Sequence, residues 1–129
     1  MLDAGGDWLD LHDDLGVPVP GVRGRAGACG ITLDGHGIGA DLLELAPGSG
    51  FPLHVHPGDH ILYGLDGEGT VTVNGVAYVI RKGVTVFVAA EQPHAVGGPA
   101  GGERALTLIA FGVPHKHISS PERMKVVGR

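Results

Sequence analysis

Short apolar runs, rich in β-branched residues and separated by glycine-containing turns, dominate the chain from residue 25 onward. Within many of these runs apolar and polar positions alternate, which is typical of strands that bury one face. The clearest case is residues 70–79, where alternating β-branched residues surround Asn74-Gly75, a pair that favours a two-residue hairpin turn. Short strands at regular spacing indicate an all-β fold, either a sandwich or a double-sheet jelly roll. The predicted strands are residues 25–33, 39–46, 53–55, 60–65, 70–73, 77–81, 84–88, 94–96 and 104–112.

The two ends of the chain differ from this pattern. Residues 5–15 show weak helical spacing, so we expect a short N-terminal helical segment, and the prolines of residues 17–21 then predict an extended linker. Residues 119–124 read as a capped helical turn, with serine before proline at the first helical position. We therefore divide the chain into an N-terminal segment (1–24), a β-barrel domain (25–113) and a C-terminal tail (114–129).

Composition excludes several classes of function. A chain of 129 residues is long enough for one domain with a hydrophobic core. Its single cysteine, Cys29, cannot form an intramolecular disulfide, which is compatible with a reducing cytosol. A net charge of −5 offers no basic surface for nucleic acid. No apolar run approaches the roughly 20 residues that span a bilayer, and residues 1–3 begin no signal peptide. We expect a cytoplasmic protein that binds neither nucleic acid nor membrane.

Four histidines, His54, His56, His60 and His94, are spaced so that they can converge on one metal ion. Side chains alternate faces along a strand, so His54 and His56 project to the same side. His60 shares that side if the turn at residues 57–59 lets the chain re-enter a strand, and His94 follows another predicted strand and turn. Neutral imidazole is a common ligand of divalent transition metals. We predict a metal site; four surface histidines near turns are the alternative.

These residues also resemble a known family. Residues 48–67 are similar to the first cupin motif, in which a glycine precedes H-x-H and another glycine closes the hairpin, and residues 83–94 are similar to the second motif. The resemblance implies a cupin jelly roll, also called a double-stranded β-helix, whose histidines point into the mouth of one small barrel. It also implies a homodimer, because small jelly rolls of this family commonly pair their sheets.

The sequence departs from the cupin pattern in three places. His60 stands where the commonest motif has Glu, Ala89 and Glu91 replace the usual Pro and Gly of the second motif, and Gly98 replaces its terminal Asn. The first departure changes the charge around the metal, because four neutral imidazoles leave the full +2 of the ion where a carboxylate would reduce it to +1. The others concern loop geometry.

The ligand set restricts the metal. Nitrogen ligands suit Fe, Mn, Ni, Cu or Zn and argue against Ca and Mg. We expect one divalent transition metal, Fe or Mn as the native ion, with Cu, Ni and Zn as alternatives. Four protein ligands would leave one or two positions open, which is typical of reactive sites.

Strand alternation suggests which residues line the barrel. If His60 faces inward, Leu62 and Gly64 do so as well, while Ile61 and Tyr63 face the opposite side. On the last long strand, either residues 106, 108 and 110 or residues 105, 107 and 109 face inward, and the greater bulk of the first set favours it. Ordinary core packing is the alternative for each. The predicted lining of an apolar substrate pocket is Phe51, Leu62, Leu106 and Leu108.

No convincing general base emerges from the sequence, so no catalytic residue is assigned beyond the metal ligands. Asp59 lies in the turn between ligands, where it either supports the site or is a solvated turn residue, and Glu44 and Glu68 have nothing special beside them.

The remaining histidines are expected on the surface. His12 lies in an acidic segment, and His36 is expected at a hairpin tip. His115 and His117 form another H-x-H but follow the last strand, so a surface tail is expected, with contact to a site, even that of a neighbouring subunit, as the alternative.

Three functions are compatible with these features. The leading hypothesis is a metal-dependent, dioxygenase-like oxygenase acting on a small organic molecule. The second is a redox-neutral isomerase, cyclase or lyase that uses the metal as a Lewis acid. The third is a small-molecule-binding protein without catalysis.

Overall fold

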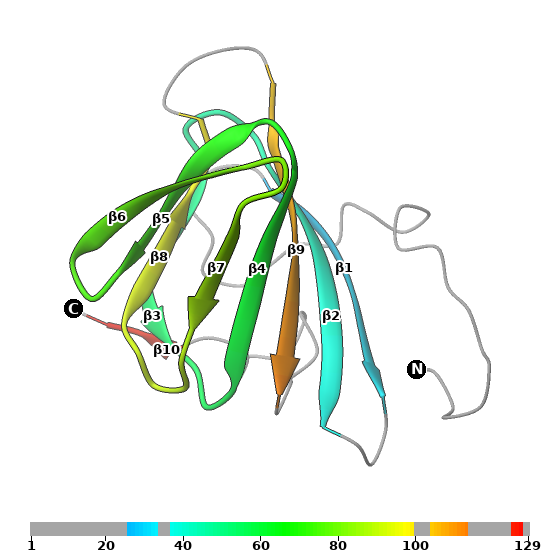
Figure 1. The fold of residues 1–129 in the computed structure, drawn as a ribbon, viewed down its shortest axis with the longest axis vertical. Coiled ribbons are helices and arrows are strands. Elements are labelled where there is room, and N and C mark those ends of the chain that lie inside the picture. The colour runs from blue at the N-terminus through cyan, green and yellow to red at the C-terminus, as the bar shows by residue number, and fades with distance from the viewer. Residues whose placement is uncertain (1–25, 34–36, 100–103, 114–124, 128–129) are drawn as a thin grey trace.

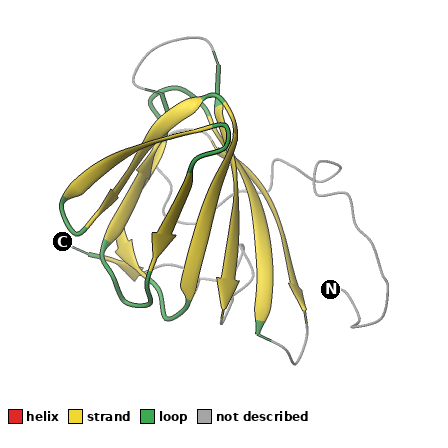
Figure 2. Cartoon of the chain, viewed as in Figure 1, coloured by secondary structure: helices red, strands yellow, loops and turns green. Residues whose placement is uncertain are grey.

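The structure, a computed structural model, describes residues 26–33, 37–99, 104–113 and 125–127, and these residues consist of strands and the loops between them (Figures 1 and 2). The helical segments predicted at residues 5–15 and 119–124 lie outside the described residues, as do His12, His36, His115 and His117. The strands are β1 (Ala26–Leu33), β2 (Ile38–Leu45), β3 (Gly50–Val55), β4 (Asp59–Asp66), β5 (Glu68–Val73), β6 (Val76–Arg81), β7 (Thr85–Val88), β8 (His94–Gly97), β9 (Leu106–Val113) and β10 (Lys125–Val126).

The strands form two five-stranded antiparallel sheets, in the orders β1-β2-β9-β4-β7 and β10-β3-β8-β5-β6. Only β1–β2 and β5–β6 are consecutive strands that pair within one sheet; the other connections, from β2 through β9, pass between the sheets. This wrapping confirms the all-β jelly roll that the sequence predicted.

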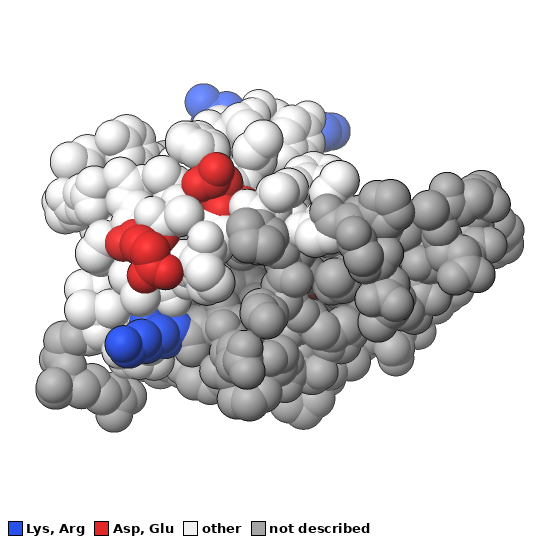
Figure 3. All heavy atoms as spheres, turned by 90° about the horizontal axis from the view of Figure 1, so that it is seen from below, with Lys and Arg blue, Asp and Glu red and all other residues white. Residues whose placement is uncertain are grey.

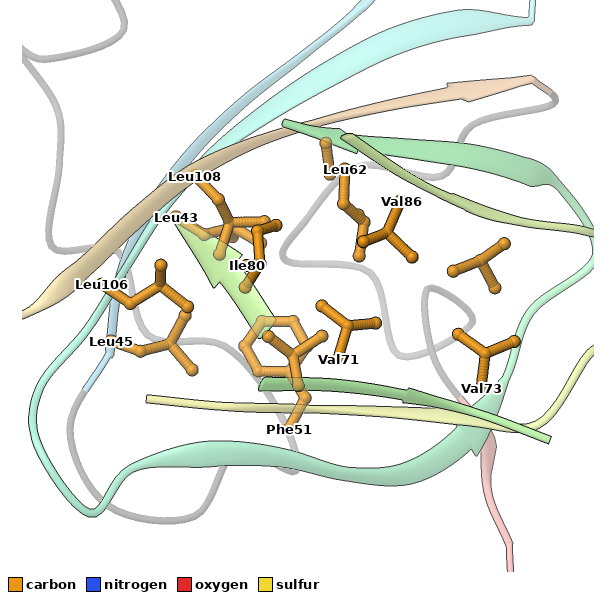
Figure 4. Close-up of a cluster of buried hydrophobic side chains, with 13 residues drawn as sticks. Leu43, Leu45, Phe51, Leu62, Val71, Val73, Ile80, Val86, Leu106 and Leu108 are labelled. Atoms are coloured by element: carbon orange, nitrogen blue, oxygen red, sulfur yellow. The ribbon is translucent and has the colours of Figure 1, made fainter. Parts of the chain in front are cut away.

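The hydrophobic core fills the space between the two sheets (Figure 4). It follows from strand alternation: on β9, Leu106, Leu108 and Ala110 are at most 1% exposed, and on β4 Leu62 is buried while Ile61 is 45% exposed. The predicted inward sets on both strands are therefore confirmed. Leu45 and Leu106 are register partners at one end of this core, whereas Val73 and Val86 lie at the other end (Figure 4).

The Asn-Gly hairpin is also confirmed. β5 and β6 pair with Val73 opposite Val76, and the two residues between them have positive φ, 50° at Asn74 and 81° at Gly75. A two-residue turn of this kind requires positive φ at both positions, which asparagine and glycine tolerate best.

One strand was not predicted. Lys125 and Val126 form β10 within the segment assigned to a C-terminal tail, and they pair with Val55 and His54 on β3. A further hydrogen bond joins the Val127 amide to the Leu53 carbonyl at 2.9 Å. Two residues are too short to show an alternating pattern, so the sequence gives no strand signal here. The C-terminal segment thus returns to the strand that carries His54.

Gly67, the glycine that closes the first motif, should be indispensable to the fold. Its φ is +70°, and a Cβ would collide with the carbonyl oxygen of Ala105. Gly75 has a similar φ, +81°, but open space around it. Gly75→Ala should lower the free energy of unfolding by about 1 kcal/mol from backbone strain, and Gly67→Ala by about 3 kcal/mol because the collision adds to it. Urea unfolding measures both; equal losses would contradict the steric role.

Candidate metal centre

Three histidines from two segments that are distant in sequence converge at one end of the barrel. His54 lies on β3, His56 follows that strand, and His94 begins β8, directly opposite His54 in the antiparallel register. All three side chains are buried, and one ring nitrogen of each lies within 4.8 Å of the others. The structure thus brings together three of the four histidines that the sequence predicted as ligands. They lie where β3 ends and β8 begins, and these strand ends are at the lower end of the barrel in Figure 1.

Each of the three imidazoles is held by a main-chain carbonyl. The Nδ1 atom of His54 lies 2.6 Å from the Pro52 oxygen, that of His56 2.9 Å from the Gly58 oxygen, and that of His94 2.9 Å from the Gln92 oxygen. A carbonyl oxygen only accepts hydrogen bonds, so each Nδ1 must carry the proton. Each Nε2 is then an unprotonated donor atom, which is how neutral histidine binds a metal.

The donor geometry fits a transition-metal ion. The Nε2 atoms of His56 and His94 lie 3.1 Å apart, and with both protons on Nδ1 two lone pairs face each other at this distance. Such an arrangement needs positive charge between the nitrogens. Two nitrogens that bind one ion at about 2.1 Å, at a right angle to one another, lie about 3 Å apart. The spacing therefore suits two ligands of the same ion, and the all-nitrogen donor set suits a divalent transition metal.

His60 lies against this group without being one of its three converging nitrogens. Its ring stacks on that of His56, with centroids 3.8 Å apart and planes inclined by 22°, and only 4% of the residue is exposed. The fourth predicted ligand is therefore in the site, buried and adjacent to a ligand. Its binding to the metal stays a prediction.

Two loops join to assemble the site. The amide of Glu91 donates to the His56 carbonyl at 2.9 Å, and the amide of Ala90 donates to Asp59 Oδ1 at 2.7 Å. The loop that precedes His94 is thereby fixed to the loop that follows His56, although the two loops are more than thirty residues apart. Asp59 is exposed, and its carboxylate holds one loop of the site to the other through this hydrogen bond.

Glu91 occupies the position at which the cupin motif has glycine. The backbone conformation of Glu91 explains why glycine is usual there. Its φ is +61°, a left-handed conformation that costs most residues about 1 kcal/mol or more. The loop thus has the left-handed backbone conformation that glycine favours, although glutamate occupies this position. Two hydrogen bonds between Ala89 and Gln92, one from main chain to main chain and one to the Gln92 side chain, close the same turn.

The four residues predicted to line a substrate pocket all belong to the hydrophobic core cluster, and each is at most 5% exposed. Phe51 connects this core to the site, because its ring centroid lies 6.1 Å from that of His54. Contact of Phe51, Leu62, Leu106 and Leu108 with a substrate stays a prediction.

The sequence analysis missed one acidic residue inside the barrel. Asp41 on β2 is 0% exposed, and it alternates with Leu43 and Leu45, both of which face the core. Glu44, which the sequence analysis did consider, is exposed on the other face. The signal was available in the spacing of Asp41, Leu43 and Leu45, but a lone carboxylate in an apolar strand is easily taken for a surface position. Asp41 thus places a buried carboxylate on the inner face of β2.

Charged side chains are sparse on the described surface around this end of the molecule. Figure 3, which views the molecule from below, shows acidic and basic groups separated by uncharged surface, with no continuous basic patch on the described part. Among the described residues no helix is long and apolar enough to cross a membrane.

Comparisons with known proteins agree with this geometry. Residues 41–112 match the protein-family model of the Cupin domain. The chain is similar to dimethylsulfoniopropionate lyase DddW of Ruegeria pomeroyi, at 36% identity over 61 residues. This match covers 46% of the chain and 40% of that lyase, so the chain spans less than half of the relative.

Solved structures share the fold. The polyketide cyclase RemF of Streptomyces resistomycificus superposes with a TM-score of 0.74 at 18% identity, covering 96% of this chain and 87% of RemF. A predicted oxalate decarboxylase of Thermotoga maritima superposes with a TM-score of 0.61 at 24% identity, covering 74% of this chain and 85% of that protein.

Replacing His56 by alanine should abolish metal binding at this site. Loss of an outer partner of a ligand already costs about 10- to 100-fold in metal affinity, so loss of the ligand should cost at least about 100-fold. Leu53→Ala is the matched control, since Leu53 lies on β3, three residues before His56, and is 39% exposed. Both variants are dialysed against the same concentration of zinc, and the zinc bound per chain is then measured. Equal stoichiometry in the His56 variant and the control would disprove the site.

The role of His60 can be tested with its stacked geometry retained. His60→Phe keeps a ring that can stack on His56 but removes the nitrogens, whereas His60→Glu supplies the ligand of the commoner motif. If His60 is a ligand, His60→Phe should lower Co(II) affinity by at least about tenfold and alter the visible spectrum of the bound ion, while His60→Glu should retain the ion. Unchanged affinity and spectrum in the Phe variant would show that His60 only packs.

Proposed function

Because the chain belongs to the cupin family, we propose that it is a metal-dependent enzyme that converts a small organic molecule without net oxidation, as a lyase, isomerase or cyclase does. The observation that carries this proposal is the donor set: three buried imidazoles whose Nδ1 protons are bound to carbonyls, with no carboxylate among the converging ligands. A divalent ion held by neutral ligands keeps its full charge and acts as a Lewis acid that polarises a carbonyl or carboxylate oxygen.

The residues of the chain supply the rest of such a site. The histidines are preorganised, because each ring is fixed by a hydrogen bond to a carbonyl two residues from it in the sequence. The three histidines are at most 4% exposed, and Phe51 of the core cluster lies next to His54. Asp41 places a carboxylate inside the same barrel, and we infer that it accepts or returns a proton at Oδ1 or Oδ2 during the reaction.

The relatives support the redox-neutral class. Their names describe a lyase, a cyclase and a predicted decarboxylase, three kinds of reaction whose net chemistry consumes no oxidant. This support concerns the class of chemistry and not the substrate. The oxygenase that led the sequence analysis stays a prediction, as do the identity of the metal and the homodimer.

Anaerobic turnover tests the proposal. Protein purified without a histidine tag, reconstituted with Zn(II) and kept free of oxygen should convert at least one member of a panel of dimethylsulfoniopropionate, oxalate and β-keto acids. Zinc has no redox chemistry, so product formed under these conditions must come from Lewis-acid catalysis. The His56→Ala variant should form no product. Turnover that required both oxygen and Fe(II) would overturn the proposal in favour of an oxygenase, and binding without turnover would favour a binding protein.

A further inference from the structure

A groove opens on the side of the barrel, between the free edges of the two sheets. β6 is the last strand of one sheet and β7 the last strand of the other. Tyr78 on β6 pairs with the fully buried Val71, so it faces the barrel interior, yet it is 47% exposed. Val76, which pairs with the buried Val73, is 52% exposed for the same reason. The inner face of β6 therefore extends beyond the cover that β7 provides.

The groove has the size and lining of a small-molecule site. Its volume is about 410 Å³, within the range of about 300–1,000 Å³ that is common for ligand pockets. Val73 and Val86 of the core form its floor, and Tyr78 contributes an aromatic ring. Thr85, Phe87, Ala89 and Gln92 also line it. None of these residues is charged, so the groove suits an uncharged, apolar group with a hydrogen-bonding atom.

The groove adjoins the metal centre. Val73 in its floor is the cross-strand partner of His94, and such partners have Cβ atoms about 5 Å apart. Gln92 in its wall accepts the Nδ1 proton of His94 through its carbonyl oxygen at 2.9 Å. Val86 in the floor is paired with Leu62, two residues after His60. A molecule seated in the groove therefore lies one layer of side chains from the histidines.

We propose that this groove binds a small molecule through a flat aromatic or unsaturated group, next to the metal centre. The aromatic part is recognised by the Tyr78 ring and the two valines beneath it, because apolar surface and ring stacking favour a planar group there. Tyr78 is thus a specificity-determining residue.

The two tyrosines of the chain provide a matched experiment. Tyr63 lies on the outer face of β4 and is 39% exposed, whereas Tyr78 lies in the groove and is 47% exposed. The probe is 2-naphthoate, a planar ring system with one carboxylate, titrated by calorimetry into zinc-loaded protein. Tyr78→Ala should weaken binding about tenfold, and Tyr63→Ala by less than about twofold. Equal losses in both variants, or no loss in either, would overturn the proposal.

A second measurement locates the probe and separates this proposal from the proposed function. In ¹H–¹⁵N spectra, 2-naphthoate should shift the amides of Val73, Val86 and Gln92, and the uncharged probe naphthalene should shift Val73 and Val86 even in metal-free protein. Shifts confined to the outer face around Tyr63 would overturn the groove. Shifts in the groove together with a failure of anaerobic turnover would uphold the groove as a binding site and reject only the proposed reaction.

Discussion

The hydrogen bond from imidazole Nδ1 to a main-chain carbonyl is the interaction on which the metal centre depends. It occurs three times, at His54, His56 and His94, and each acceptor lies only two residues away in the sequence. Each bond fixes the orientation of one ring and leaves its Nε2 atom unprotonated. The rings are therefore oriented locally, and the jelly roll has only to bring the oriented rings together.

The fold performs this second task through its connections between sheets. β3 and β8 are neighbours in one sheet, which places His54 opposite His94, while the hydrogen bonds of Glu91 and Ala90 attach one loop of the site to the other. The hydrophobic core continues directly from the leucines at one end of the barrel to Phe51 beside His54. Stability and site geometry thus share the same strands, so a change that disturbs the register of β3 and β8 should separate the ligands as well.

The sequence predicted what local patterns encode. Alternation predicted most strands and the inward positions of β4 and β9, Asn74-Gly75 predicted the hairpin, and histidine spacing predicted three residues that the structure brings together. Other features depend on contacts between distant segments. β10 is too short for a pattern, Asp41 is distinguished only by the strands that bury it, and the groove exists because β6 extends past β7. A single sequence carries no local signal for how far one sheet edge extends beyond the other.

The most direct test of the metal centre is the protonation state of its imidazole nitrogens. Long-range ¹H–¹⁵N NMR of ¹⁵N-histidine-labelled protein, assigned with single histidine-to-glutamine variants, reports each ring nitrogen before and after one equivalent of Zn(II). His54, His56 and His94 should each keep a proton on Nδ1 and show a large shift of Nε2 when zinc is added. Protonated Nε2 atoms that do not respond to zinc would contradict a metal centre built on these carbonyl hydrogen bonds.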